Sequence, residues 1–332
     1  MCQICRRSFM RGAAALGAAG ATGLLSSPLM AQAAGEAGAS KLPPRGEFTI
    51  TGAYVMTMDG TLGDIAGGSV HVRNGEIVAV GKDIAGGGEK IDGAGMIVMP
   101  GLVETHWHMW NTIFRSFAGD RPEEGYFPTV ARFGAQMTPD DIFQSTRLSA
   151  AEAINSGMTF AHSWCHNVRS TAHAEADIRA LAEIGIRARH SCGWPQGLPD
   201  TQSADQAPIE TLARDSENAK AENEFKMTAR KALELGTIDG ARSMGIDDKV
   251  GSLTPGKRAD LIAISPNALN MAVVSDPAHL VLEATGPENV DTVVVDGRIL
   301  KRGGKLTALD TSEIIAGARA ALAGVRERTK WR

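Results

Sequence analysis

Predicted strands and helices alternate between residues 99 and 192, and this alternation constrains the fold more than any other feature of the chain. The expected order is a strand at 99–108, a helix at 138–157, a strand at 158–164, a helix at 171–183 and a strand at 186–192. Thr138 is a natural N-cap, and Pro139 follows it at the first helical position. Repetition of strand and helix builds parallel sheets, so the sequence predicts the α/β class.

Two histidines lie two positions apart near the end of the first predicted strand. Because side chains alternate along a strand, His106 and His108 should point to the same face. Two adjacent imidazoles are half of a metal site, since zinc takes three or four protein ligands. The sequence therefore predicts that His106 and His108 bind a divalent metal ion.

Further histidines lie on the later elements of the same region. His162 and His166 are on or just after the second predicted strand, near enough to the first pair to be substitute metal ligands or substrate contacts. The alternative for both is a hydrogen-bonded histidine that binds no metal. His173, in the first turn of a helix, and His190, in the middle of a strand, are expected to be structural.

Short β elements flank the α/β region on both sides. Asn74-Gly75 and Asp296-Gly297 each separate two apolar runs, and they supply the positive φ angles of a type I′ hairpin turn. Single strands are also expected at 47–60, 91–99 and 259–264. We therefore expect a small β module that draws strands from both ends of the chain.

The economical architecture is one small β-sandwich built from both ends of the chain, with the α/β region inserted. The sandwich is expected to comprise residues 45–100 and 250–305, and the α/β region, residues 101–249, lies between them in the sequence. Residues 306–332 carry an amphipathic C-terminal helix, for which Thr311 is the predicted cap.

Residues 1–34 have the pattern of a targeting signal. Arg6-Arg7-Ser8-Phe9-Met10-Arg11 resembles the twin-arginine motif, and Ala31-Gln32-Ala33 offers a small-x-small cleavage site. The alternative is an N-terminal membrane anchor, but the intervening stretch is weakly apolar and is broken by Gly and Pro28. We expect a periplasmic protein that the twin-arginine route exports and that has no membrane contact in its mature form.

Charge and cysteine usage limit the partners of the chain. A net charge of −4, with 22% charged residues, gives no reason to propose nucleic acid or an anionic membrane. The expected partner is a small-molecule substrate. The chain could also form a homo-oligomer in which exposed strand edges pair. Cys165 and Cys192 remain after the signal, either as a disulfide or as a free pair.

Two blocks resemble the amidohydrolase superfamily, in the branch that contains cytosine deaminase and chlorohydrolases. They are IDGAGMIVMPGLVETHWH at 91–108 and VGSLTPGKRADLI at 250–262, and the resemblance covers residues 45–200 and 220–305. It implies that residues 101–249 form an incomplete TIM-type (β/α) barrel beside the β-sandwich. It also implies a metal-dependent hydrolase of carbon–nitrogen bonds in a cyclic amide, amidine or aminoheterocycle. His106 and His108 would be ligands on barrel strand 1, and the metal would be zinc, with iron and manganese as alternatives.

The sequence departs from that family in the middle of the barrel. The segment 106–251 is much shorter than the about 250 residues of a full barrel. The resemblance implies a His ligand on strand 5, a His on strand 6 that contacts substrate, and an Asp on strand 8 that is both a ligand and the general base. No histidine lies between 193 and 251, so the two histidines have no counterpart. No predicted strand followed by a metal-facing Asp precedes the last helices, so the general base is missing as well. We expect an internal deletion whose join lies within 202–224. An inactive truncated relative, or an assembly module that needs another chain, is therefore the alternative to an active hydrolase.

Overall fold

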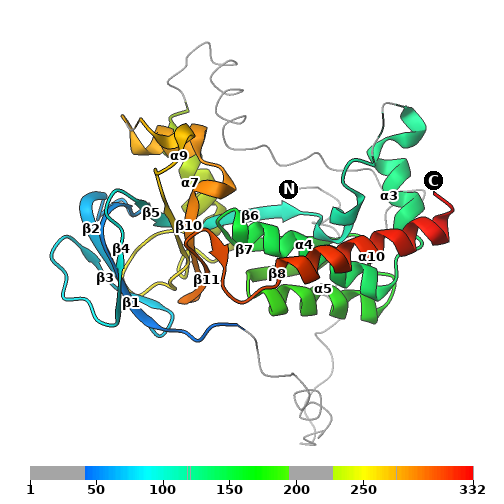
Figure 1. Cartoon of the computed structure of the whole chain (residues 1–332), viewed down its shortest axis with the longest axis horizontal. Coiled ribbons are helices and arrows are strands. Elements are labelled where there is room, and N and C mark those ends of the chain that lie inside the picture. Colours follow the sequence, from blue (N-terminus) through cyan, green and yellow to red (C-terminus); the bar gives the residue numbers. More distant parts are fainter. Residues whose placement is uncertain (1–41, 118, 120, 194–226, 274, 332) are drawn as a thin grey trace, which may run out of the picture. The chain divides into compact units, whose positions relative to one another are not determined.

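The computed structural model describes residues 42–117, 119, 121–193, 227–273 and 275–331 (Figure 1). The expected targeting signal, 1–34, and the expected join, 202–224, lie outside these residues. Within them, no helix combines the length and apolar character that crossing a membrane requires. The predicted fold class is confirmed, because parallel strands with helices lie beside a sheet from both ends of the chain.

Nine strands form that mixed sheet. In chain order they are β1 (Glu47–Met56), β2 (Asp64–Arg73), β3 (Glu76–Gly81), β4 (Glu89–Asp92), β5 (Ile97–Pro100), β9 (Leu261–Ile264), β10 (Val290–Val295), β11 (Arg298–Arg302) and β12 (Lys305–Leu306). The order in the sheet is β12-β11-β10-β9-β5-β1-β2-β3, and β4 pairs with β1. The two halves of the chain meet at the antiparallel pair of β5 and β9, where Val98 lies opposite Ala263.

The sheet curls so that its β3 end meets the segment that leads into β9. Ala259 N donates to Gly75 O at 2.9 Å, and Ile77 N donates to Lys257 O at 2.9 Å. The curled sheet encloses its own apolar cluster, to which Phe48, Ile50, Val70, Val72, Ile77, Leu261 and Val294 belong. Burial of such a cluster is what holds a small β module together.

Both predicted hairpins are confirmed. Asn74 and Gly75 have φ angles of 53° and 87° between β2 and β3, and Asp296 and Gly297 have φ angles of 55° and 72° between β10 and β11. Both pairs have the positive φ angles that a type I′ turn requires. Side-chain identity at the two central positions was therefore enough to place these turns.

Two strand predictions need correction. The strand expected at 91–99 is two strands, β4 and β5, because a turn intervenes in which Met96 N donates to Gly93 O at 2.9 Å. The first strand ends at Met56 rather than near residue 60. The chain turns there because the Asp59 carboxylate accepts from the backbone nitrogens of Thr61 and Leu62, at 2.8 and 3.1 Å.

A second sheet contains three parallel strands. They are β6 (Leu102–Trp107), β7 (Met158–Cys165) and β8 (Arg187–Cys192), in that order. The helices α4 (Pro139–Asn155) and α5 (Thr171–Ile184) connect them, so the predicted alternation is confirmed. Thr138 and Asp141 form a capping box at the start of α4, and Gly185, with φ 82°, ends α5.

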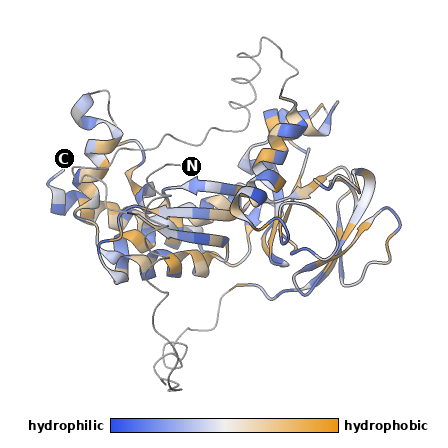
Figure 2. Ribbon diagram, turned by 180° about the vertical axis from the view of Figure 1, so that it is seen from behind, coloured by the Kyte–Doolittle hydropathy of each residue, from blue (hydrophilic) through white to orange (hydrophobic). Residues whose placement is uncertain are grey.

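The remaining helical segments surround the two sheets. They are η1 (Met109–Phe114), η2 (Pro122–Glu124), α3 (Tyr126–Gly134), α7 (Ala229–Glu234), the π-helical turn η3 (Leu235–Asp239), α8 (Gly240–Met244), η4 (Leu269–Met271), α9 (Pro277–Ala284), η5 (Pro287–Asn289) and α10 (Thr311–Thr329). Figure 2 shows hydrophobic and hydrophilic residues mixed along these helices, as expected for amphipathic elements.

The cap of α10 also needs correction. Thr311 is the first helical residue, and Asp310 is the N-cap, because its carboxylate accepts from Ser312 N at 2.9 Å and from Glu313 N at 3.2 Å. Two adjacent residues were competent to cap, and aspartate is at least as good a cap as threonine.

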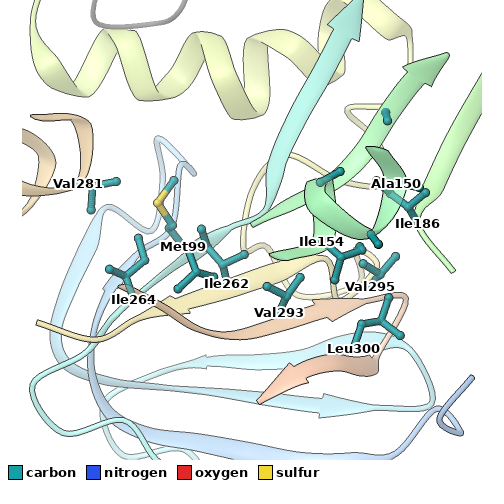
Figure 3. Packing of buried hydrophobic residues seen from close by; sticks show 14 of the residues in the cluster. Met99, Ala150, Ile154, Ile186, Ile262, Ile264, Val281, Val293, Val295 and Leu300 are labelled. Atoms are coloured by element: carbon teal, nitrogen blue, oxygen red, sulfur yellow. The ribbon is translucent and has the colours of Figure 1, made fainter. Parts of the chain in front are cut away.

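One apolar cluster joins the two sheets (Figure 3). It contains Ile154 of α4, Met99 of β5, Ile262 of β9 and Val293 of β10, all buried. Helix α4 thus packs on the mixed sheet as well as beside β7. The three parallel strands are therefore fixed to the β module through a shared core.

Candidate functional site

Four predicted histidines gather at the carboxyl ends of β6 and β7. The ring centroids of His106 and His108 are 5.0 Å apart, as the alternation of side chains along β6 predicts. The ring of His166 lies 4.7 Å from that of His108. Trp164 occupies the centre of the group, stacked on His106 at 4.8 Å and 5.0 Å from His162. The structure therefore brings all four candidate residues into one neighbourhood.

The imidazole of His108 is oriented by a backbone carbonyl. Its Nδ1 lies 3.0 Å from Trp164 O, and a carbonyl oxygen can only accept, so Nδ1 carries the proton. The lone pair is then on Nε2. A metal-binding histidine has the same arrangement, in which one ring nitrogen donates to a fixed acceptor and the other binds the ion.

Burial keeps the first pair of histidines neutral. Desolvation lowers the pKa of His108, and desolvation together with the neighbouring His108 lowers the pKa of His106. The backbone of His106 is fixed as well, because its nitrogen donates to Glu104 Oε1 at 2.8 Å. A neutral imidazole is the form that binds a metal, so both side chains are in the right state at neutral pH.

The hydrogen-bonded alternative fits His162 better than a ligand role does. Its Nδ1 lies 3.0 Å from Thr105 O and 3.0 Å from Trp164 Nε1, and it either donates to the carbonyl or accepts from the indole N–H. Its Nε2 lies 2.7 Å from Ser191 Oγ. Both ring nitrogens are therefore engaged in contacts between β6, β7 and β8. His162 is buried, which suits a residue that fixes the spacing of these strands.

His166 packs against the pair rather than completing it. Its ring is nearly parallel to that of Trp164, with the centroids 5.9 Å apart. Gly193 allows this position, because a Cβ atom added there would lie 2.7 Å from Nδ1 of His166. Any larger residue at 193 would displace the imidazole.

The donor set fits part of a metal site. Across the described ranges, no three or more His, Cys, Asp or Glu side chains are arranged to hold one ion. His106 and His108 have the tautomer and the protonation state for two ligand positions, whereas a catalytic zinc has three protein ligands. The pair therefore fits two of the ligand positions of a zinc site.

A hollow of about 280 Å³ opens near the end of β6. It lies between η1 and α3, and its lining includes Trp107, Arg115 and Tyr126. No histidine lines the hollow, and the alternation of side chains along β6 turns Trp107 away from the face that His106 and His108 share. The volume is at the lower limit of ligand pockets, which usually measure about 300–1,000 Å³.

A second group of polar side chains, which the sequence patterns did not predict, lies at β8. His190, expected to be structural, lies 2.6 Å from the carboxylate of Asp177 and 3.1 Å from the sulfur of Cys192. Cys165 and Cys192, whose pairing was left open, are both free thiols and lie opposite each other on β7 and β8. The i, i+2 spacing of His190 and Cys192, the same as that of the first pair, was the available signal.

Comparison with known families and sequences finds matches over most of the chain. A family model described as the amidohydrolase family matches residues 200–300. A 5-methylthioadenosine/S-adenosylhomocysteine deaminase of Natronomonas pharaonis is 32% identical over 278 residues, which are 80% of this chain and 56% of that protein. A 5′-deoxyadenosine deaminase of Methanobrevibacter smithii is 41% identical over 110 residues, which are 32% of this chain and 25% of that protein. The chain thus spans about half, or less, of these relatives.

Solved structures share the fold. An adenosine deaminase from Xanthomonas campestris with bound zinc has a TM-score of 0.70 at 17% identity, and the match covers 86% of this chain and 100% of that one. An atrazine chlorohydrolase from Arthrobacter aurescens complexed with zinc has a TM-score of 0.68 at 17% identity, with 83% and 100% covered. At this identity the likeness shows the fold alone.

Proposed function

Because the chain belongs to the amidohydrolase superfamily, we propose that it is a metal-dependent hydrolase of carbon–nitrogen bonds in small molecules. The observation that carries the proposal is the His106 and His108 pair, in which Trp164 O fixes Nδ1 of His108 and leaves Nε2 for a divalent ion. When bound, the ion supplies Lewis-acid activation of water for hydrolysis. The chain's own residues hold and orient it.

The expected substrate is an aminopurine nucleoside. Two of the similar proteins described above are a 5′-deoxyadenosine deaminase and a 5-methylthioadenosine/S-adenosylhomocysteine deaminase. Hydrolytic deamination replaces an exocyclic amine by oxygen and releases ammonia, which is cleavage of a carbon–nitrogen bond. Zinc is the proposed ion because neutral imidazoles suit it, and iron and manganese are the alternatives.

A second candidate function, an assembly that needs another chain, is favoured by the small number of metal ligands among the described residues. The described residues provide two imidazoles, and β8 is the outer strand of the three-stranded sheet. A second chain that adds strands to β8 could also bring the missing ligands. In this case the protein hydrolyses substrate only as an assembly, either with itself or with another family member.

Zinc binding tests the proposal. We expect the purified chain, stripped of metal, to bind close to one zinc per chain, and His106→Ala or His108→Ala to weaken binding by at least about 100-fold. Metal content and calorimetric titration give the measurement. His279→Ala is the matched control, because His279 is an exposed histidine on α9 that pairs with Glu283. Loss of zinc in that control, or no zinc in the wild type, would contradict the assignment.

An ammonia-release assay with 5′-deoxyadenosine, adenosine and a set of cyclic amides then separates the candidates. Turnover by the isolated chain, lost in His106→Ala, supports the hydrolase. Turnover only after a full-length family member is added supports the assembly. Zinc binding without turnover in either case would indicate an inactive relative, because a bound ion without a general base loses orders of magnitude in rate.

We also propose that the chain acts in the periplasm. The support is the pattern at 1–34, in which Arg6 and Arg7 precede a weakly apolar stretch. Replacing both arginines by lysine is expected to leave the protein in the cytoplasm, as cell fractionation and immunoblotting would measure. Unchanged recovery from the periplasm would contradict twin-arginine export. A variant in which only Lys41, beyond the signal, is changed to arginine serves as the control.

A further inference from the structure

Asp177, His190 and Cys192 form a connected row on α5 and β8. Nδ1 of His190 lies 2.6 Å from Oδ2 of Asp177, and Nε2 of the same ring lies 3.1 Å from the sulfur of Cys192. A nucleophile next to a base, with a carboxylate behind the base, is the order of groups in a nucleophilic triad. The row shares no residue with the His106 and His108 pair. His190 lies opposite Ser163 in the register of β7 and β8, whereas His162 lies opposite Arg189, so the row and His162 face opposite sides of the sheet.

The carboxylate in this row is held firmly. Asp177 is fully buried, and its Oδ1 accepts from Thr146 Oγ1 at 2.6 Å and from Ser163 Oγ at 3.3 Å. These donors come from α4 and β7, so two neighbouring elements fix the carboxylate of α5 against β8. A buried carboxylate that retains its hydrogen bonds is costly to assemble, and such groups recur where they orient a functional side chain.

This carboxylate determines which nitrogen of His190 carries the proton. Oδ2 of Asp177 accepts, so Nδ1 donates and Nε2 presents its lone pair to the thiol of Cys192. The side chain of His190 is only 13% exposed, so its imidazole is largely shielded from solvent. Cys192 is exposed, so a small molecule can reach its sulfur.

We propose that Cys192 is a nucleophilic thiol and a site of covalent modification by soft carbon electrophiles. Nε2 of His190 takes the thiol proton, and the sulfur then attacks the electrophilic carbon. A carbon–sulfur bond forms as the leaving group departs with the electron pair of the broken bond. The imidazolium finally releases its proton to water, so the base is regenerated.

Cys165, the neighbouring cysteine on β7, lacks the features that activate Cys192. Cys165 is buried on β7, and burial raises the pKa of its thiol well above the usual range. A buried thiol that stays protonated is inert toward electrophiles. Of these two neighbours, which lie opposite each other in the sheet, only Cys192 combines exposure with a base.

Alkylation kinetics test the proposal. With iodoacetamide at pH 7, the peptide that contains Cys192 should be labelled about tenfold faster in the native chain than in the same chain unfolded in urea. Peptide-resolved mass spectrometry separates this cysteine from the other three. His190→Gln should remove the acceleration, and Cys165→Ser should leave it unchanged. A native rate no higher than the unfolded rate would overturn the proposal.

A second variant tests the tautomer. Asp177→Asn keeps the shape but offers an amide that can place the proton of His190 on Nε2, facing the sulfur, so labelling should fall toward the unfolded rate. The ultraviolet absorbance of the thiolate should fall with it, which loss of packing alone in a folded variant does not explain. Circular dichroism checks the fold, and His190→Gln decides the question if Asp177→Asn unfolds. Unchanged labelling in a folded His190→Gln variant refutes the assignment.

Discussion

Replacing Arg187 with alanine is expected to lower the free energy of unfolding by about 3–5 kcal/mol. Nε and Nη2 of Arg187 donate to the two oxygens of Asp260 at 2.7 and 3.0 Å. The side chain of Asp260 is 1% exposed, so the variant would leave a carboxylate buried without its cation. Urea unfolding followed by circular dichroism gives the measurement.

The geometry of this pair explains why the cost should be large. Arg187 begins β8, and Asp260 directly precedes β9, so the pair ties the parallel strands to the mixed sheet. Nη2 of Arg187 also reaches Asp296 in the β10–β11 hairpin at 3.4 Å. The amide of Asp296 still donates to Asp260 Oδ1 at 2.7 Å in the variant. That remaining bond places the expected loss nearer about 3 than 5 kcal/mol.

Arg115→Ala is the matched control, because Arg115 pairs with Glu152 where both side chains are about half exposed, at 51% and 43%. Solvent-exposed ion pairs contribute about 0–1 kcal/mol, so this variant should unfold close to the wild type. Equal losses in the two arginine variants would show that burial of the pair is not what sets its contribution.

Local patterns were sufficient for much of the fold. Asn74-Gly75 and Thr138-Pro139 act through neighbours within a few residues, so the sequence contains all the information that forms the turn and the cap. The adjacency of His106 and His108 is equally local, because it depends only on the alternation of side chains along β6. These features were predicted correctly for that reason.

Contacts between distant segments were not accessible in this way. Asp177 and His190 are 13 residues apart, and Arg187 and Asp260 are 73 apart. No periodicity specifies that a helix carboxylate will face a strand imidazole. The predicted cap of α10 was wrong for a different reason. Asp310 and Thr311 are adjacent and both residue types can cap a helix, so only the backbone angles at the helix start distinguish them.

The candidate metal pair and its neighbour His162 show where local patterns stop being sufficient. His106 and His108 could be placed from the sequence, since they share one strand. The engagement of His162 with Thr105 and Ser191 could not, because it depends on how β6 and β8 lie against β7. Sequence therefore predicts a pair of candidate ligands, and only the structure shows which neighbours have a ring nitrogen available.

Replacing Ile154 with alanine is the second change from which we expect a large effect, a loss of about 2–5 kcal/mol. Ile154 is fully buried near the end of α4, among Val293, Val295 and Leu300 of the mixed sheet (Figure 3). Truncation removes buried methyl groups and leaves a cavity between the sheet and the helix. The cavity remains because the close-packed helix and sheet relax only partially to fill it. Urea unfolding measured by circular dichroism reports the loss.

Ile178→Ala is the matched control, because it makes the same substitution at an isoleucine on α5 whose side chain is 50% exposed. A change within about 0.5 kcal/mol is expected there.

The denaturant dependence of the Ile154→Ala variant also tests whether the two sheets share one core. If the parallel strands and the mixed sheet share one core, the variant unfolds in a single transition with an unchanged slope, since the same surface is exposed. Two transitions, with only one of them shifted, would instead mean that the three-stranded sheet and the β module fold separately. In that case the proposed metal pair on β6 would depend on the stability of the smaller sheet alone.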